Sequence, residues 1–577
     1  MFYITLVIVI YLIITAYLGY LGYSTTKNAS DYLVAGRKQH PMIMAISYGA
    51  TFISTSAIVG FGGAAAVFGM GLLWLTFLNI FVGIFIAFVL FGKRTRKMGH
   101  NLDAHTFPEL LGKRFNSRFL QALASLVIFV GMPLYAGSVM IGGAQFICQT
   151  LSINYEVALL FFTAIVALYV VMGGLKGVMY TDAFQGTLMF IGMGILLYYT
   201  YSGLGGIVSA HKQLTAMAPL AIGAFGKGGH LGWTAMPVFG SALWSQLITT
   251  IVLGVGIGVL TQPQLVVRFM TVKSDRELNR AVLVGGIFIL MMTGVAFIIG
   301  ALSNVYFYNK PVIMPAPIVA SAAAPAPASS AKAAPVKAVA KKAAVTAPAV
   351  PATPPPMISV KAAGGKVDNI IPLYINTYMP KWFPAIFMIT LLAAAMSTLS
   401  SQFHTMGSAF GRDFCESGLG IRKVSTIFIT RLGMGITILF SLFLAYYLPK
   451  FFESGSAIIA IGTSIFFALC ASAFLPLYFG ALYTKRITKA GAIAGLISGV
   501  TSSLFWLCFV HSKESVPLGL CKALFKVPTL AGTSNLQYVD ALIICLPVSI
   551  IFTLLFSVFT KPPETALLDV CFKDIKK

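Results

Sequence analysis

Charged residues are scarce in this chain, and acidic residues are the scarcest of them. Only 10% of the 577 residues are Asp, Glu, Lys or Arg, against about 25% in an ordinary soluble protein. Hydrophobic residues make up 58% of the chain, and its mean hydropathy is +0.88. A sequence this apolar and this poor in charge could not cover a water-facing surface, which excludes a soluble enzyme.

The residues of common metal and catalytic sites are also few. Seven cysteines form no CxxC pair and lie mostly in apolar runs, which excludes a disulfide framework. Seven histidines form no HExxH, and neither a nucleophile elbow nor a P-loop is present, so we expect no enzyme activity. His404 alone falls inside an apolar segment, where a packing or pore-facing role is expected.

The 16 acidic residues face 40 basic ones, which gives a net charge of +24. In a soluble protein this excess would suggest nucleic acid as a partner. In a membrane protein it indicates the positive-inside bias of cytoplasmic loops, so we expect no nucleic-acid partner.

Apolar segments dominate what is present. Thirteen are long enough to cross a bilayer, which takes about 20 residues. They lie near 3–23, 41–65, 71–92, 119–150, 155–173, 181–203, 238–261, 281–306, 382–411, 425–447, 455–482, 490–510 and 537–560. An N-terminus outside and a C-terminus in the cytoplasm would put about 25 of the 40 basic residues inside or at inner helix ends. This count includes Arg268, in an expected cytoplasmic loop over 262–280.

One acidic residue stands out because nearly all the others fall in expected loops or at helix ends. Asp182, in the stretch YTDAFQG, lies at or just inside a helix end on the cytoplasmic side. An N-cap is the simplest interpretation of an Asp at a helix start. A functional role is the alternative, because a carboxylate near hydrocarbon is costly.

A run of hydroxyls forms the second candidate. In AAAMSTLSSQ (393–402), Ser397, Ser400 and Ser401 share one helical face. Such hydroxyls often bond to the preceding turn or join helices. They are also hard oxygen donors of the kind that small cations prefer.

Two glycine-interrupted segments form the third candidate. They read GATFISTSAIVGFGGAAAVFG (49–69) and ITTIVLGVGIGVLTQPQ (248–264), and each would open a five-segment unit, the two units being inverted. Close packing through small residues is one explanation. The other is the pair of broken helices that forms the substrate site of an inverted-repeat transporter.

At these residues the sequence resembles the sodium:solute symporter family. Five blocks carry the resemblance in family order: ATFISTSAIVG (50–60), TFPELLGKRF (106–115), GGLKGVMYTDAFQGTLM (173–189), TQPQLVVRFMTVKSDRELNRA (261–281) and AAAMSTLSSQ (393–402). The resemblance implies an all-α integral membrane protein with a LeuT-type five-plus-five inverted repeat. Its first and sixth core helices would be broken.

The resemblance also implies cation sites. A first sodium site would use carbonyls or hydroxyls of Ala50, Ile53, Ala394, Ser397 and Thr398. A second, found in some members, would use Asp182, Ser400 and Ser401. One or two sodium ions are therefore expected.

The solute site is less well defined. Ser54 matches a pocket position of the family, and other candidates are Thr55, Thr76, Asn79, Tyr135, Val255 and Val259. Proline transporters carry aromatic residues where this chain has Val255 and Val259, and the arginine clamp of sialic acid transporters is missing from the segment 119–150. An amino-acid-like, monocarboxylate or pantothenate-like solute is expected.

The resulting hypothesis is a sodium-coupled importer in the plasma membrane, active as a monomer by family resemblance. A proton-coupled symporter of the same fold and a transporter-like sensor are the alternatives. The repeats would span 41–204 and 238–482, joined by an external loop at 205–237. An extra helix and loop (1–40) would precede them, and two helices with a tail (483–577) would follow. The Ala/Pro/Lys-rich stretch 311–357 cannot bury a core and is expected to be an external insert.

Overall fold

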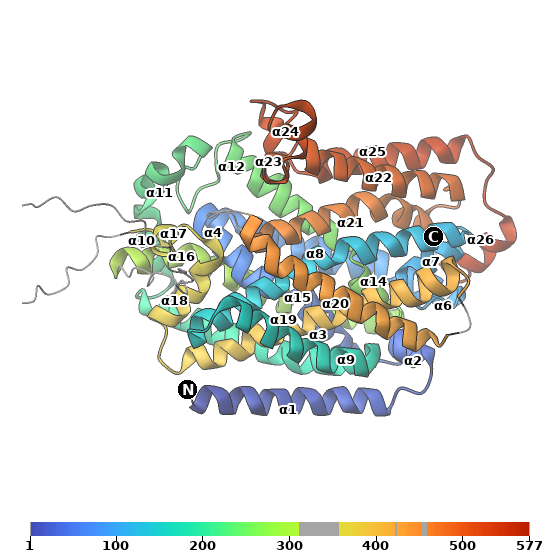
Figure 1. Cartoon of the computed structure of the whole chain (residues 1–577), viewed down its shortest axis with the longest axis horizontal. Helices are drawn as coiled ribbons and strands as arrows, with labels where there is room; N and C mark the ends of the chain where they lie inside the picture. Colours follow the sequence, from blue (N-terminus) through green and yellow to red (C-terminus); the bar gives the residue numbers. More distant parts are fainter. Residues whose placement is uncertain (1, 311–356, 422–423, 452–457, 576–577) are drawn as a thin grey trace, which may run out of the picture.

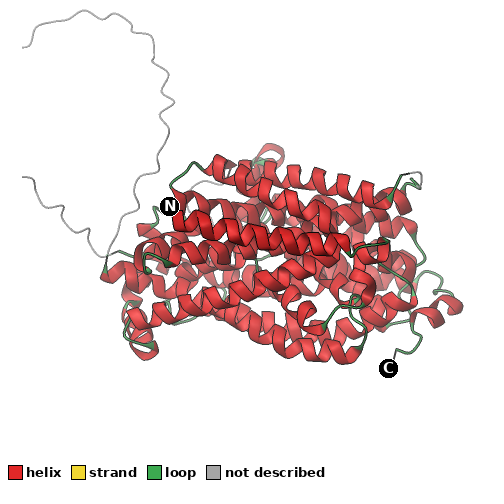
Figure 2. Cartoon of the chain, turned by 90° about the horizontal axis from the view of Figure 1, so that it is seen from below, coloured by secondary structure: helices red, strands yellow, loops and turns green. Residues whose placement is uncertain are grey.

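The computed structural model describes residues 2–310, 357–421, 424–451 and 458–575. Within these ranges every regular element is a helix and no strand occurs, as Figure 2 shows, which confirms the all-α prediction. Apart from Met357, the insert predicted at 311–357 lies outside the described residues.

Eleven helices of the described chain are long and apolar enough to cross a membrane. Two shorter apolar helices, Pro41–Phe52 and Tyr155–Ala167, accompany them. Together they correspond to the thirteen expected segments, since the segment expected at 41–65 is split and its second part runs on into the next one.

Up to residue 310 the main helices follow in this order: α1 (Phe2–Ser24), α2 (Ala29–Val34), α3 (Pro41–Phe52), η2 (Ser56–Phe61), α4 (Gly62–Phe68), α5 (Leu73–Ile80), η4 (Phe81–Gly92), α6 (Lys93–Asn101), α7 (Phe107–Arg114), α8 (Arg118–Leu151), α9 (Tyr155–Gly203), α10 (Ile207–Ala216), α11 (Ala218–Phe225), α12 (Ala242–Ser245), η6 (Gln246–Val255), α13 (Gly256–Gly258), η7 (Val259–Thr261), α14 (Pro263–Phe269), α15 (Asp275–Ile289), η8 (Leu290–Gly294) and α16 (Val295–Asn309).

The remaining main helices are α17 (Ser359–Ala362), η9 (Val367–Asn369), α18 (Ile370–Tyr378), α19 (Phe383–Ser408), η10 (Ala409–Gly418), α20 (Thr426–Phe451), α21 (Ile458–Tyr483), α22 (Lys489–Phe509), α23 (Ser512–Leu518), α24 (Leu520–Phe525), η11 (Asn535–Tyr538), α25 (Ala541–Val558) and α26 (Thr565–Cys571).

The long helices lie side by side along one axis of the molecule (Figure 1). The short helices α10, α11, α17 and α18 gather at one end of this bundle, together with the N-terminus. At the opposite end lie α2, α6, α7, α26 and the C-terminus. The two termini are therefore at opposite ends of the bundle.

Two interruptions define the core helices. After α3, Ile53 adopts an extended conformation (ψ 108°), and helix resumes at Ser56. In the second unit the glycine run at 254–258 stays helical, contrary to the expected break there. The helix is interrupted instead at Gln262 (ψ 113°), because the following Pro263 disfavours helical geometry at the residue before it and starts α14.

Small residues bring the core helices close together. A Cβ atom at Gly300 of α16 would lie 1.9 Å from the carbonyl oxygen of Gly62 in α4. In α9 the helix is kinked at Gly174, where φ is +59°, a value that favours glycine. The kink separates the first part of α9 from the part that carries Asp182.

Candidate functional site

The break after α3 and the hydroxyl run of α19 meet inside the bundle. The Ser397 hydroxyl donates to the Ala50 carbonyl at 2.9 Å and to the Ala394 carbonyl at 3.2 Å. The Thr398 hydroxyl donates to the Thr51 carbonyl at 3.1 Å. All of these residues are fully buried. Hydroxyl and carbonyl oxygens from two helices therefore converge, as the predicted first sodium site requires, and Ile53 follows at the end of α3.

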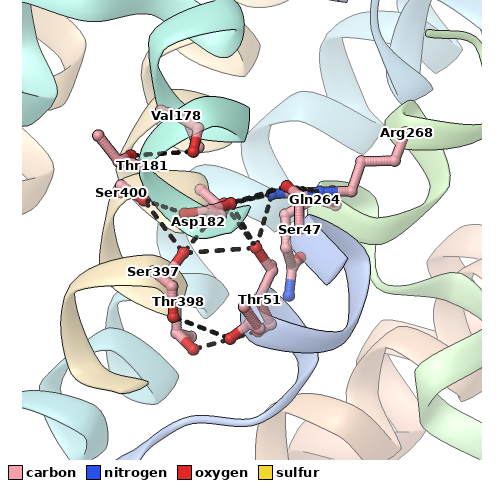
Figure 3. A network of polar contacts seen from close by, with 12 residues as sticks. Ser47, Thr51, Val178, Thr181, Asp182, Gln264, Arg268, Ser397, Thr398 and Ser400 are labelled. Atoms are coloured by element: carbon pink, nitrogen blue, oxygen red, sulfur yellow. Dashed lines mark hydrogen bonds and ion pairs between the residues drawn. The ribbon is translucent and has the colours of Figure 1, made fainter. Parts of the chain in front are cut away.

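Asp182 lies beside this convergence. It is in the middle of α9 and fully buried, so the N-cap interpretation is wrong. Its Oδ2 accepts hydrogen bonds from Ser47 at 2.9 Å and Thr51 at 3.1 Å, both on α3. On α19, Ser400 donates to Oδ1 at 3.4 Å and Ser401 to Oδ2 at 3.5 Å. The three residues predicted for a second cation site are thus in contact, and Figure 3 shows Asp182 and Ser400 together.

The partner that sequence reasoning missed is Arg268. It lies on α14, fully buried, and not in a cytoplasmic loop as expected. Figure 3 shows its side chain reaching Asp182, where Nη2 lies 2.8 Å from Oδ2. The same nitrogen donates to Thr51 and Ser401, at 2.6 Å each.

The guanidinium group therefore supplies a positive charge where the second cation was expected. Its Nε donates to Ser47 at 3.2 Å and its Nη1 to the Gln264 carbonyl at 2.5 Å. A charged pair in the interior is tolerated when such hydrogen bonds satisfy both groups, and removing one partner leaves an uncompensated buried charge.

A small cavity of about 20 Å³ lies beside the break after α3. Its lining contains no charged side chain. It is lined by Phe52, Ile53, Ser54, Ala57, Phe61, Leu75, Asn79, Tyr135, Val255, Thr293, Phe297, Thr463 and Phe467. Ser54 accepts a hydrogen bond from Tyr135 at 3.5 Å, while the Asn79 Oδ1 atom is buried without a partner in the described part of the chain.

The structure sorts the predicted solute residues into two groups. Four of them line the cavity: Ser54, Asn79, Tyr135 and Val255. Three do not: Thr55, Thr76 and Val259. Thr55 donates instead to the Val139 carbonyl at 2.7 Å. Thr293 and Phe297 of the η8–α16 stretch and Thr463 and Phe467 of α21 were not foreseen, because no local signal marks them.

Five consecutive residues join these sites. Ala50 offers its carbonyl to Ser397, and Thr51 binds the Asp182–Arg268 pair with its side chain. The cavity is lined by Ile53 and Ser54, which follow Thr51 by two and three residues. A conformational change at the helix break would therefore alter the oxygens of the first sodium site, the Asp182–Arg268 ion pair and the cavity at the same time.

His404, one turn beyond Ser401, is also buried, and neither ring nitrogen has a hydrogen-bond partner among the described residues. Its ring lies 5.3 Å from that of Tyr32. No cluster of three or more His, Cys, Asp or Glu side chains suited to a metal occurs within the described ranges. The oxygen-rich surroundings of Ser397 suit a hard cation better than a transition metal.

Comparison with known proteins points in the same direction. The sequence profile of the Sodium:solute symporter family matches residues 32–340 and 342–499. Sodium/proline symporter 2 of Staphylococcus saprophyticus is 25% identical over 524 residues, covering 89% of this chain and 87% of its own. The osmoregulated proline transporter OpuE of Bacillus subtilis is 24% identical, covering 86% and 87%.

A solved structure shares the fold. It is the substrate-bound outward-open state of a Na⁺-coupled sialic acid symporter, with a TM-score of 0.68 and 19% sequence identity. The match covers 97% of this chain and 98% of that one. The predicted fold class is thereby confirmed, as an all-helical bundle of this transporter type.

Proposed function

The chain belongs to the sodium:solute symporter family, and we propose that it imports a small organic solute together with sodium by alternating access. The observation that carries the proposal is the convergence of buried oxygens from the broken helix α3 and from α19. Transporters of this architecture bind coupling ions at such breaks, where carbonyls lack helical partners.

The first sodium ion is assigned to Ala50, Ile53, Ala394, Ser397 and Thr398. Ser397 already bridges the carbonyls of Ala50 and Ala394 at 2.9 and 3.2 Å. An ion held there ties α3 to α19, which favours one arrangement of the two helices over the other. Coupling then follows from the different affinity of the ion for the two states.

The second sodium ion would compete with the guanidinium group of Arg268 for the same oxygen ligands. Arg268 Nη2 contacts Asp182 and Ser401, two of the three residues assigned to that ion. An ion bound between Asp182, Ser400 and Ser401 therefore requires the guanidinium group to move away. In the arrangement described here one sodium ion binds, and a second would bind only in a state where the Arg268–Asp182 contact is open.

The solute is proposed to be amino-acid-like, with no net charge. The cavity is lined by hydroxyl, phenol and amide groups and by aromatic rings, with no charged side chain among the described residues. Its volume of about 20 Å³ means that the surrounding helices separate to admit the solute. A monocarboxylate or pantothenate-like anion would find no cation there. The amino and carboxyl groups of a zwitterion can instead bind backbone groups at the helix break.

The membrane orientation is proposed from charge. The loops at the end of the bundle with α2, α6 and α7 are rich in basic residues, which supports a cytoplasmic position for that end and an external N-terminus.

A sodium-dependent thermal shift of the purified protein tests the proposal. Sodium in place of potassium should stabilise the protein, by about 2.7 kcal/mol at a concentration of 100 times Kd. Ser397→Ala and Thr398→Ala should abolish this shift. Ser408→Ala is the matched control, because Ser408 lies on the same helix and, within the described residues, donates only to the Thr405 carbonyl.

A sodium shift that survives both substitutions would disprove the first site. The same assay, repeated in sodium over a panel of neutral amino acids, monocarboxylates, vitamins and sugars, identifies the solute. Stabilisation by an anion and not by a zwitterion would contradict the proposed solute class.

A further inference from the structure

A second buried carboxylate lies on the helix that carries the sodium ligands, at its far end. Asp413 belongs to η10, the π-helical continuation of α19, and is fully buried. This helix is fixed against α20, since a Cβ atom at Gly411 would lie 2.6 Å from the Thr430 nitrogen. π-Helical turns are frequent at functional sites, yet binding of sodium at Ser397 gives Asp413 no role.

The two oxygens of Asp413 have unequal surroundings. Oδ1 accepts hydrogen bonds from the Thr106 hydroxyl at 2.8 Å and from Gln121 Nε2 at 2.7 Å. Both donors are neutral. Oδ2 is buried without a hydrogen-bond partner, and no described Lys, Arg or His side chain forms an ion pair with Asp413. Burying an ionised carboxylate in this way would be costly, whereas a carboxylic acid is tolerated.

The nearby cations are bound by a different carboxylate. Arg412 donates to Glu109 through Nε and Nη2, at 3.0 Å each, and Lys113 lies 2.9 Å from Glu109. Burial opposes ionisation of Glu109, but hydrogen bonds from His105 and Arg412 and the charges of Arg412 and Lys113 hold its pKa well below the usual range. Glu109 is therefore the ionised member of the pair, and its negative charge opposes ionisation of Asp413.

The other helices packed around η10 do not change this balance. α8 presents the neutral Gln121 to Asp413. On η10 itself, Glu416 accepts a hydrogen bond from Thr426 at 2.7 Å. α20 carries Arg431, whose charge acts on Tyr32 of α2.

We propose that Asp413 is a proton-binding site. Its carboxyl group carries a proton while η10 is closed against α7 and α8. When the contact with Thr106 and Gln121 opens to water, the Oδ2–H bond breaks and the proton passes to solvent. Low pH at the end of the bundle that carries α7 therefore favours the closed conformation, and high pH favours opening, because proton binding and conformation are linked.

Infrared difference spectroscopy tests the proposal without sodium or solute, so its result does not depend on the proposed symport. Wild-type protein minus Asp413→Asn at pH 7 should contain the carbonyl stretching band of a protonated carboxylic acid. Wild type minus Glu416→Gln, the matched control on the same helix, should contain carboxylate bands instead. A carboxylate signal from Asp413 at pH 7 would overturn the proposal.

Thermal unfolding between pH 6 and pH 9 gives an independent measurement. A proton held by the folded protein and released on unfolding makes stability fall as pH rises, by up to about tenfold in the unfolding constant per pH unit. Wild type should show this additional loss and Asp413→Asn should lack it. Gln121→Leu removes one donor to the carboxylate, so its proton should persist to a higher pH than in wild type. Equal pH dependence of wild type and Asp413→Asn would overturn the proposal.

Discussion

Asp182 and Asp413 are both fully buried, and both are tied to the helix formed by α19 and η10. Both accept hydrogen bonds from neutral side chains. They differ in their ion pairing: Arg268 lies 2.8 Å from Asp182, whereas no described cation forms an ion pair with Asp413 and the adjacent Arg412 is bound to Glu109. Burial alone therefore does not decide whether a carboxylate is charged. The neighbouring cation decides it, because an unpaired buried charge costs several kcal/mol.

The two carboxylates therefore suit different ligands, although both are in contact with the helix formed by α19 and η10. Near Ser397 and Asp182 the charge and the oxygens suit a cation, supplied either by sodium or by the Arg268 side chain. Near Asp413 the neutral donors suit a carboxylic acid. A displacement of the α19–η10 helix would change both surroundings together.

Removing the positive charge of Arg268 from beside Asp182 should have the largest effect on stability. Arg268→Gln leaves Asp182 buried without its cation, which should cost about 3–5 kcal/mol of stability and abolish sodium-dependent uptake. The double variant Asp182→Asn/Arg268→Gln removes both charges and should regain most of the stability. The measurement is thermal unfolding of the purified proteins together with uptake into vesicles.

Arg114→Gln is the matched control for this cycle. Arg114 is also fully buried, but it donates to the backbone carbonyls of Ala481 and Thr484. Adding Asp182→Asn to it should therefore give no rescue. A double variant at 182 and 268 that is no more stable than Arg268→Gln would contradict the pairing.

The sequence predicts much of this fold because its signals are local. Apolar length marks the crossing helices, and the hydroxyl spacing of Ser397, Ser400 and Ser401 places them on one face of α19. The break before Pro263 was also readable, since proline starts helices and restrains the residue before it. The break predicted at the glycine run 254–258 was wrong, because these residues stay helical.

Arg268 could not be predicted in the same way. A single arginine in a segment rich in basic residues is typical of a cytoplasmic loop, and its partner Asp182 is 86 residues earlier in the chain. Only the packing of α14 between α3 and α19 brings them together. The apolar neighbours in QLVVRFM were the one available signal that Arg268 is buried. The cavity residues Thr463 and Phe467 depend on the same long-range packing.

A second prediction concerns Glu109, the carboxylate near Asp413 that is paired with Arg412 and Lys113. Glu109→Gln leaves Arg412 and Lys113 without their carboxylate and should cost about 2–3 kcal/mol at pH 7. Because the pKa of Glu109 is held low, its contribution is present above about pH 4 and is lost as the pH falls further. The stability difference from wild type should therefore shrink in acid, as measured by denaturation at pH 7 and pH 3.5.

The same variant sharpens the comparison at Asp413. With the negative charge of Glu109 gone and Arg412 free to turn, Asp413 acquires the kind of neighbour that Asp182 has. Its acid band in the infrared spectrum should weaken at pH 7. An unchanged band would show that the charges on Glu109 and Arg412 do not control the proton on Asp413.

The smallest effect is expected at the opposite end of the bundle, where Asp368 is a further buried carboxylate. Its Oδ2 accepts a hydrogen bond from the Ile459 nitrogen at 3.4 Å, and Oδ1 has no partner within the described part of the chain. Burial raises its pKa to about 7, although the N–H groups of Ile459 and Ile458 act to lower it. The folded protein thus holds this proton more tightly than the unfolded chain.

The sign of the resulting pH dependence is opposite to that of Glu109. Stability from the Asp368 proton is fully present below about pH 4 and is lost as the pH rises through about 7. Wild type should therefore lose about 1–2 kcal/mol more than Asp368→Asn between pH 6 and pH 8. Asp569→Asn, at a side chain that is 78% exposed, is the control and should follow wild type. Parallel curves for wild type and Asp368→Asn would show that a buried carboxylate can remain ionised here without a cation, which would also weaken the case for a proton on Asp413.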